Sequence, residues 1–276
     1  MESEEYLRLE LTKIEKWEKD QNSLWFWERL GRLPFKVLDK LTPTFIQTKI
    51  GSLLDGIGSF IQTGGQYLTR EQTILNKLSN ELPEQKELTL EDVSSLPLKI
   101  MDQVSEDIKQ SESRAATAQG ATTGFGGLFT LAIDIPILLG MSLKTLQDLA
   151  LTYGYNPRDR DERIFIVKCL QFATSDIVGK KTILDDLNSF YQDKPAGKKE
   201  MISQIQGWRE VVYTYRDHFG IKKLFQMVPI AGMVFGAITN RGMISDIADA
   251  GTMLYRKRRI YEKIQELQQV NNAFKP

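Results

Sequence analysis

Apolar positions in the first twenty residues recur at helical spacing. Leu7, Leu11, Ile14 and Trp17 follow one another at intervals of four and three, with Glu and Lys between them. This period places the apolar side chains on one face of an amphipathic helix, which we expect over residues 3–20. We treat residues 1–22 as a separate N-terminal helical segment.

Helical patterning continues through the rest of the chain. Residues 80–92, NELPEQKELTLED, are polar and contain a proline, so they predict a linker between two helical parts. Thr69 with Gln72, and Thr89 with Asp92, each resemble a capping box at a helix start. No alternating run of apolar and polar residues predicts a strand. We therefore predict an all-α, multi-helix bundle-like protein, with residues 23–276 forming a single helical domain.

Two long uncharged stretches interrupt the amphipathic pattern, one between Arg114 and Asp134 and one over residues 224–240. Each approaches the length of a membrane span. Asp134 followed by Pro136 is a helix-start signal, because the carboxylate caps N–H groups and proline has no N–H to lose. We therefore expect separate helices over 115–133 and 135–153, the second ended by Tyr153-Gly154.

Small residues recur every fourth position in both stretches, which lets helix backbones approach closely. We expect glycine-rich apolar helical hairpins to form the core, with Gly124 and Gly236 at helix crossings. Short or broken segments favour a packed interior over membrane insertion. The two rows are Ala116, Gly120 and Gly124, and Gly232, Gly236 and Asn240.

Composition excludes several classes of site. A single cysteine, Cys169, and a single histidine, His218, exclude a disulfide framework and a multi-histidine metal centre. Cys169 has an apolar helical context typical of a buried thiol, and His218 is placed to end a helix. No phosphate-binding loop or nucleophile elbow is present. We expect no catalytic residue, no metal and no cofactor.

Acidic residues gather at three places, none with a motif that specifies a reaction. Asp159, Asp161 and Glu162 fall where a helix begins, so capping explains them. Asp185 and Asp186 fall on the polar face of the next helix. Asp134 is a helix cap or a functional polar residue at membrane depth.

Charge is balanced overall, at 36 basic and 36 acidic residues, which argues against a nucleic-acid partner. The two parts of the chain differ: residues 1–110 carry 14 basic and 19 acidic side chains, and residues 111–276 carry 22 and 17. Basic residues beside apolar helices are typical of binding to an anionic membrane surface. The residues that we predict to bind it are Lys222, Lys223, Arg256, Lys257, Arg258 and Arg259.

The uncharged stretches and their surroundings resemble the EcsC protein family over roughly residues 30–262. A glycine-rich apolar stretch precedes an Asp-x-Pro step, a helix and a Tyr-Gly-Tyr turn, and a second glycine motif ends in a basic helix. The matching residues are Gly120, Gly124, Gly127, Asp134, Pro136, Tyr153, Gly154, Tyr155, Pro229, Gly232, Gly236 and Asn240.

The resemblance implies a bacterial protein encoded beside an ABC transporter, and it supplies no reaction. We therefore expect a non-enzymatic accessory protein in the cytoplasm or peripheral at the cytoplasmic face of the membrane. Its expected partners are the anionic membrane surface or ABC transporter subunits. Two alternatives stay open: a soluble lipid- or hydrophobic-ligand-binding helical module, and a hydrolase using acidic residues near Asp134.

Overall fold

The structure is a computed structural model that describes residues 2–21, 59–60, 69–125, 128–175, 177–191 and 229–273. Every regular element in these ranges is a helix, which confirms the all-α prediction. The helices are α1 (Glu4–Asp20), α5 (Glu71–Asn80), α6 (Leu90–Val93), α7 (Leu98–Phe125), α8 (Leu128–Thr152), α9 (Arg160–Thr174), α10 (Ile177–Tyr191) and α13 (Pro229–Ala273).

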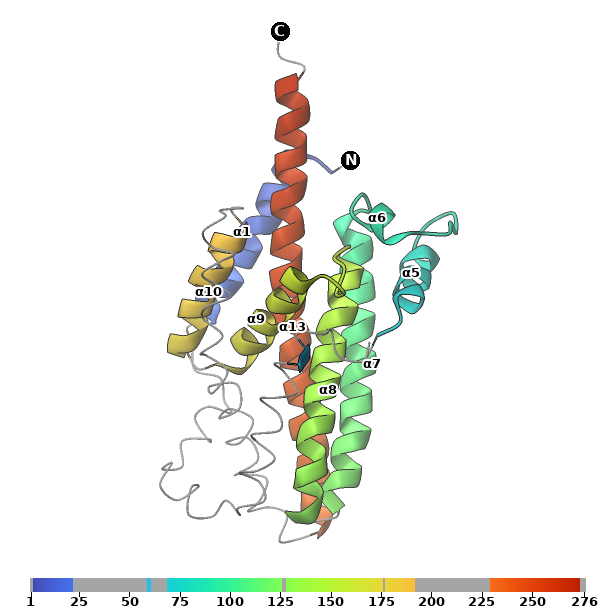
Figure 1. The fold of residues 1–276 in the computed structure, drawn as a ribbon, viewed down its shortest axis with the longest axis vertical. Coiled ribbons are helices and arrows are strands. Elements are labelled where there is room, and N and C mark those ends of the chain that lie inside the picture. Colours follow the sequence, from blue (N-terminus) through green and yellow to red (C-terminus); the bar gives the residue numbers. More distant parts are fainter. Residues whose placement is uncertain are drawn as a thin grey trace.

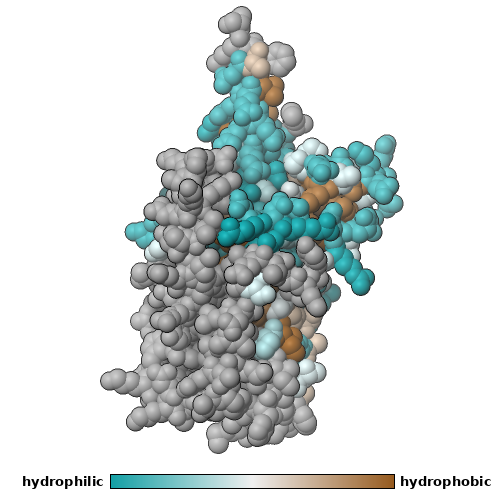
Figure 2. Space-filling model, viewed as in Figure 1, coloured by the Kyte–Doolittle hydropathy of each residue, from teal (hydrophilic) through white to brown (hydrophobic). Residues whose placement is uncertain are grey.

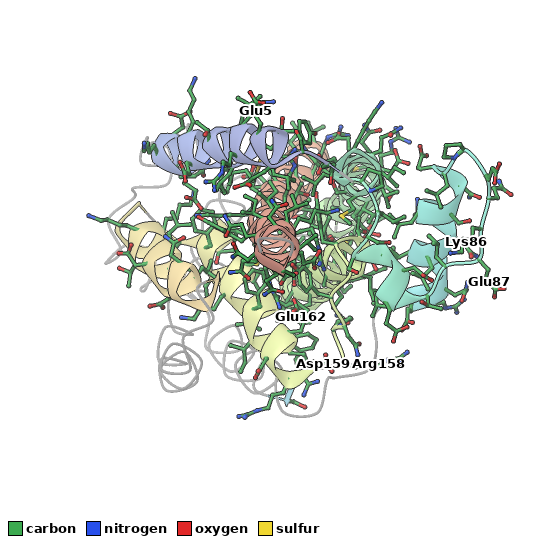
Figure 3. The ribbon with its side chains drawn as sticks, turned by 90° about the horizontal axis from the view of Figure 1, so that it is seen from above. Glu5, Lys86, Glu87, Arg158, Asp159 and Glu162 are labelled. Carbon is green, nitrogen blue, oxygen red and sulfur yellow. The ribbon has the colours of Figure 1, made fainter. Side chains whose placement is uncertain are left out.

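The long helix α13 is the axis of the molecule (Figure 1). Its 45 residues extend for about 65 Å at 1.5 Å per residue. The hairpin of α7 and α8 packs along α13 as far as Arg256 and Arg259, and α1, α9 and α10 lie around its second half. Viewed along the axis, α13 is enclosed by the other helices (Figure 3). We call the end where α7 meets α8 the hairpin end, and the opposite half the polar end.

The N-terminal helix forms where the sequence predicts it. The Ser3 hydroxyl caps its first turn by accepting a hydrogen bond from the backbone N–H of Tyr6, at 3.2 Å. Leu7 and Ile14 are fully buried, and α1 contacts α13. The apolar stripe thus docks α1 onto the central helix.

The expected helix break at Asp134 is wrong. α7 ends at Phe125 and α8 begins at Leu128, so helix continues from there through Asp134 and Pro136 to Thr152. A local start signal is a weak preference, and the packing of α8 along α7 and α13 outweighs it. The predicted stop is confirmed: α8 ends before Gly154, whose φ of 80° suits glycine.

Of the two expected capping boxes, one is confirmed. Thr89 and Asp92 cap the short helix α6 reciprocally. The other is wrong, because α5 takes Arg70 as its N-cap residue. The hydroxyl of Thr69 instead donates a hydrogen bond to Asp148 of α8. Thr69 therefore bonds to a residue distant in the sequence and does not cap α5.

At the hairpin end, the backbones of α7 and α13 touch. A Cβ added to Gly120 would lie 2.2 Å from the carbonyl oxygen of Gly236, and one added to Gly236 would lie 2.3 Å from that of Gly120. A Cβ added to Gly236 would also lie 3.5 Å from the Cα of Gly124. Gly124 and Gly236 therefore lie at a close crossing, as the spacing of small residues predicts.

Candidate functional site

Four consecutive basic residues of α13, Arg256 to Arg259, form a charged layer inside the polar end. Successive residues of a helix point about 100° apart, so the four side chains of the charged layer leave α13 in different directions. Each bonds to a different residue of the surrounding structure: Arg256 and Lys257 to α1, Arg258 to α9, and Arg259 to the turn that follows α8. The layer thereby connects α13 to α1, α7, α8, α9 and α10.

Arg256 joins α1 and α7. Its guanidinium lies 2.6 Å from Glu10 of α1 and donates to both oxygens of Asp102 of α7, at 2.9 and 3.0 Å. Burial disfavours the charge on Arg256, but its attraction to Asp102 and Glu10 outweighs burial and raises its pKa. Burial likewise opposes ionisation of Glu10, yet Lys13 and Arg256 hold its pKa below the usual range.

Lys257 and Arg258 bind the other side of the layer. Lys257 is 2% exposed. Its Nζ donates to Glu18 of α1 at 2.7 Å and to Asn188 of α10 at 2.9 Å. Arg258 lies 2.6 Å from Glu162 of α9, which also accepts from the hydroxyl of Tyr255. These charges are satisfied within the protein.

Arg259 holds the Tyr-Gly-Tyr turn that ends α8. Its Nε and Nη2 both donate to the carbonyl oxygen of Tyr153, at 2.9 and 2.6 Å. A Cβ on Gly154 would lie 3.1 Å from Nη2 of Arg259, so glycine also leaves room for the guanidinium. The ring of Tyr155 faces the guanidinium carbons of Arg258 and Arg259, at 3.8 and 4.5 Å from its centroid. The turn and the basic helix end therefore form one unit.

Residues 256–259, which the sequence predicts to bind an anionic membrane, direct their charged groups into the protein. They are between 3% and 17% exposed and are engaged by carboxylates or a backbone carbonyl. Lys222 and Lys223 lie outside the described residues, as do His218 and Gly127, and the side chains of Asp134, Pro229 and Gly232 are not described.

The acidic residues at the start of α9 divide between two roles. Asp159 occupies the N-cap position of α9 without a capping hydrogen bond from its side chain, whereas Glu162 is 4% exposed and lies beside α13 (Figure 3). Capping therefore does not explain Glu162. Asp186 of α10 forms an ion pair with Lys168, at 2.9 Å. Cys169 is fully buried, and burial raises the pKa of its thiol well above the usual range, which fits a structural thiol.

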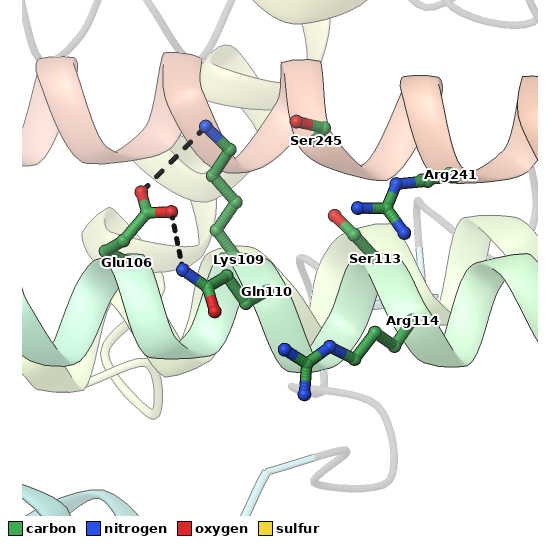
Figure 4. A pocket seen from close by; sticks show the side chains of 7 residues that line it. All are labelled: Glu106, Lys109, Gln110, Ser113, Arg114, Arg241 and Ser245. Carbon is green, nitrogen blue, oxygen red and sulfur yellow. Dashed lines mark hydrogen bonds and ion pairs between the residues drawn. The ribbon is translucent and has the colours of Figure 1, made fainter.

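A polar cavity of about 270 Å³ opens between α7 and α13, between the charged layer and the glycine crossing. Figure 4 shows α7 and α13 facing each other across it, with Ser113 and Arg241 directed toward one another. Sequence reasoning missed this site, because its residues are far apart in the chain. Its lining residues are Glu106, Lys109, Gln110, Ser113, Arg114, Arg241 and Ser245.

The cavity contains cations without a carboxylate partner. Among the described residues, no carboxylate lies within 4.0 Å of the charged atoms of Arg114 or Arg241. The hydroxyl of Ser113 is buried and has no hydrogen-bond partner. Lys109, in contrast, lies 2.7 Å from Asp249 and 3.9 Å from Glu106. Within the described ranges, no group of three or more His, Cys, Asp or Glu side chains could hold a metal ion.

The hairpin end exposes large apolar side chains. Ile137 of α8 and Val234 and Ile238 of α13 are 41%, 57% and 50% exposed. Figure 2 shows that the described residues of the polar end are mostly hydrophilic on this face, with smaller apolar patches among them. Across the described ranges, no helix combines the length and apolar content needed to cross a bilayer.

The motif residues behind the resemblance meet in space at two places. Gly120, Gly124 and Gly236 form the crossing of α7 and α13, beside which Asn240 donates a hydrogen bond to Gln119 at 2.6 Å. The Tyr-Gly-Tyr turn meets the basic helix end in the charged layer. The sequence profile of the EcsC protein family matches residues 8–260.

The chain belongs to the EcsC protein family. The match begins within α1, so the family region extends further toward the N-terminus than the motifs alone indicated. The chain is 58% identical to the "Uncharacterized protein YdbA" of Bacillus subtilis, over 96% of this chain and 97% of that one. It is 29% identical to "Protein EcsC" of the same organism, over 62% of this chain and 69% of that one. No solved structure matches the fold of this EcsC-family protein.

Proposed function

We propose that this EcsC-family protein is a non-enzymatic accessory protein that binds the cytoplasmic face of a membrane and works there beside a transporter. The transporter follows from the family resemblance alone. The observation that carries the membrane contact is the exposed apolar surface of the hairpin end, at Ile137, Val234 and Ile238. The proposed mode of contact is insertion of this end into one leaflet.

Helix length and charge position support this depth of insertion. Arg114 is the last charged residue of α7, and the helix continues for eleven residues to Phe125. Eleven residues extend about 16 Å at 1.5 Å per residue. Half the hydrocarbon thickness of a bilayer is about 15 Å. Arg114 and Arg241, the charges that bound the uncharged stretches, would then lie at the level of the lipid phosphates.

In the proposed arrangement, the polar end stays outside the membrane, on the cytoplasmic side. Its charges are internally paired in the layer of Arg256 to Arg259 and add little to membrane attraction. Apolar insertion, rather than a basic surface at residues 256–259, is therefore the proposed source of binding. The alternative of an apolar ligand pocket gains no support from the described cavity, which is lined by polar and charged residues.

Vesicle flotation tests the membrane contact. Wild type and a Val234→Asp/Ile238→Asp variant are mixed with phosphatidylglycerol or phosphatidylcholine vesicles and floated at low and high salt. We expect the wild type to float and the variant to stay behind, because each aspartate opposes insertion by roughly 2–3 kcal/mol at membrane depth. Val270→Asp is the matched control, since Val270 is 46% exposed on the same helix but lies at the polar end.

The outcomes separate lipid from protein partners. Equal flotation of wild type and the double variant would refute insertion of the hairpin end. If wild type floats on no vesicle but sediments with cell membranes, a protein partner holds it there and direct lipid binding is wrong. Asp134→Asn should float at least as well as wild type, because an ionised carboxylate in the inserted part opposes binding.

A further inference from the structure

We propose that the cavity between α7 and α13 binds a phosphate group. The cavity measures about 270 Å³, while one water needs roughly 10–15 Å³. A group of several atoms therefore fits between the two helices. Among the described residues of the lining, Glu106 is the only carboxylate, against the three cations Lys109, Arg114 and Arg241.

The lining is arranged as two facing pairs. Lys109 and Ser113 are four residues apart on α7, and Arg241 and Ser245 are four residues apart on α13. Residues at this spacing share one helix face. Two helices that pack against each other thus present a cation and a hydroxyl each to the same space (Figure 4).

The hydroxyl of Ser113 is the observation that points to a ligand. Other hydroxyls of α7 donate to helix carbonyls: those of Ser105, Ser111 and Thr117 at 2.8, 3.0 and 2.7 Å. Ser113 is 4% exposed, yet its hydroxyl oxygen has no hydrogen-bond partner within the part of the chain that the structure describes. A buried hydroxyl without a partner is costly, and an anion oxygen beside Arg241 would accept its hydrogen bond.

The charges favour an oxyanion. The guanidinium of Arg241 has no carboxylate partner among the described residues, and its planar fork suits two oxygens of one phosphate. Lys109 is partly neutralised by Asp249 and Glu106, so Arg241 and Arg114 supply the net positive charge. A phosphate offers enough oxygens to accept from Arg241, Ser113 and Ser245 together.

The phosphate could come from a lipid headgroup or from a free anion. The cavity lies just beyond the uncharged stretches, which is headgroup level in the proposed insertion of the hairpin end. The lipid as source therefore rests on the proposed function, whereas the site itself does not. Binding of a free phosphate would need no membrane.

Titration calorimetry on the full chain tests the site with two probes. These are inorganic phosphate and dihexanoyl phosphatidylglycerol below its micelle concentration, at constant ionic strength. We expect both to bind wild type, Arg241→Gln to weaken binding about ten-fold or more, and Ser113→Ala to weaken it several-fold. Arg160→Gln, which removes an exposed arginine from the first turn of α9, is the matched control and should change nothing.

Each outcome decides the proposal. Binding of neither probe, or equal binding by wild type, Arg241→Gln and Ser113→Ala, would overturn it. Binding of inorganic phosphate alone supports the site with a free anion as its ligand. If Arg241→Gln also weakens flotation on phosphatidylglycerol vesicles, the ligand is the headgroup. If wild type binds a probe in the titration but does not float on vesicles, the membrane function is refuted and the phosphate site stands.

Discussion

The two ends of α13 are held to their neighbours by opposite means. At the polar end, long charged side chains reach outward from Arg256 to Arg259 and bind partners on several helices. At the hairpin end, Gly120 and Gly236 have no side chains, and the backbones of α7 and α13 touch. The contacts at the polar end depend on paired charges, and the contact at the hairpin end depends on residues that have no side chain.

This difference explains why the same helix contains both buried and exposed cations. The arginines of the charged layer sit where helices surround α13 on all sides, so each finds a partner. Arg241 sits beside α7 near the hairpin end, where the described residues give it no carboxylate. Among the described cations of α13, Arg241 is therefore the exception, and it lines the cavity.

The largest expected effect is at the polar end. Arg258→Met leaves Glu162 buried without its cation, and should lower the free energy of unfolding by about 3–5 kcal/mol. Thermal and urea unfolding would measure the loss. Arg8→Met is the control, because Arg8 and Glu4 form a solvent-exposed pair on α1 whose loss should leave stability almost unchanged. Similar losses in both variants would contradict a special role for the charged layer.

The next effect is at the glycine crossing. Gly236→Leu places atoms against the backbone of α7 and should destabilise by about 1–3 kcal/mol, occasionally more. Gly242→Ala on the same helix is the control, because a Cβ there meets nothing within 4 Å. Alanine should stabilise that position by up to about 1 kcal/mol. Unchanged unfolding of Gly236→Leu would show that the crossing does not need glycine.

A smaller, pH-dependent effect is expected between the two ends, at Asp246. Burial and the charge of Asp249 raise its pKa to about 6, and Lys180 and Lys109 offset only part of this. The unfolded carboxyl titrates near 3.9. Between these values the folded state holds a proton that the unfolded state has lost, so stability falls as pH rises from about 4 to 6.

Asp246→Asn removes the ionisable carboxyl, and with it the loss of stability at higher pH. Unfolding in urea should show the variant more stable than wild type by about 1–2 kcal/mol at pH 7, with the difference vanishing near pH 4. Asp107→Asn, at an exposed acid of α7, is the control and should stay within about 0.5 kcal/mol of wild type. A gain that did not depend on pH would mean that packing, rather than ionisation, distinguishes the variant.

Local signals in the sequence were sufficient for several elements. The apolar stripe of Leu7 and Ile14 predicted α1, and Gly154 predicted the end of α8, because period and backbone freedom act within a few residues. The spacing of Gly124 and Gly236 predicted a close crossing. The predicted break at Asp134 failed because the packing of α8 along α7 and α13 outweighs a local start signal.

Only the tertiary structure decided where the charges go. The sequence shows four basic residues in a row, but their angular spacing on a helix and the helices around them send each to a different partner. The cavity of Ser113 and Arg241 likewise joins positions of α7 and α13 that no local pattern connects. Periodicity reports which face of a helix is apolar, whereas the pairing of charges depends on which helices pack together.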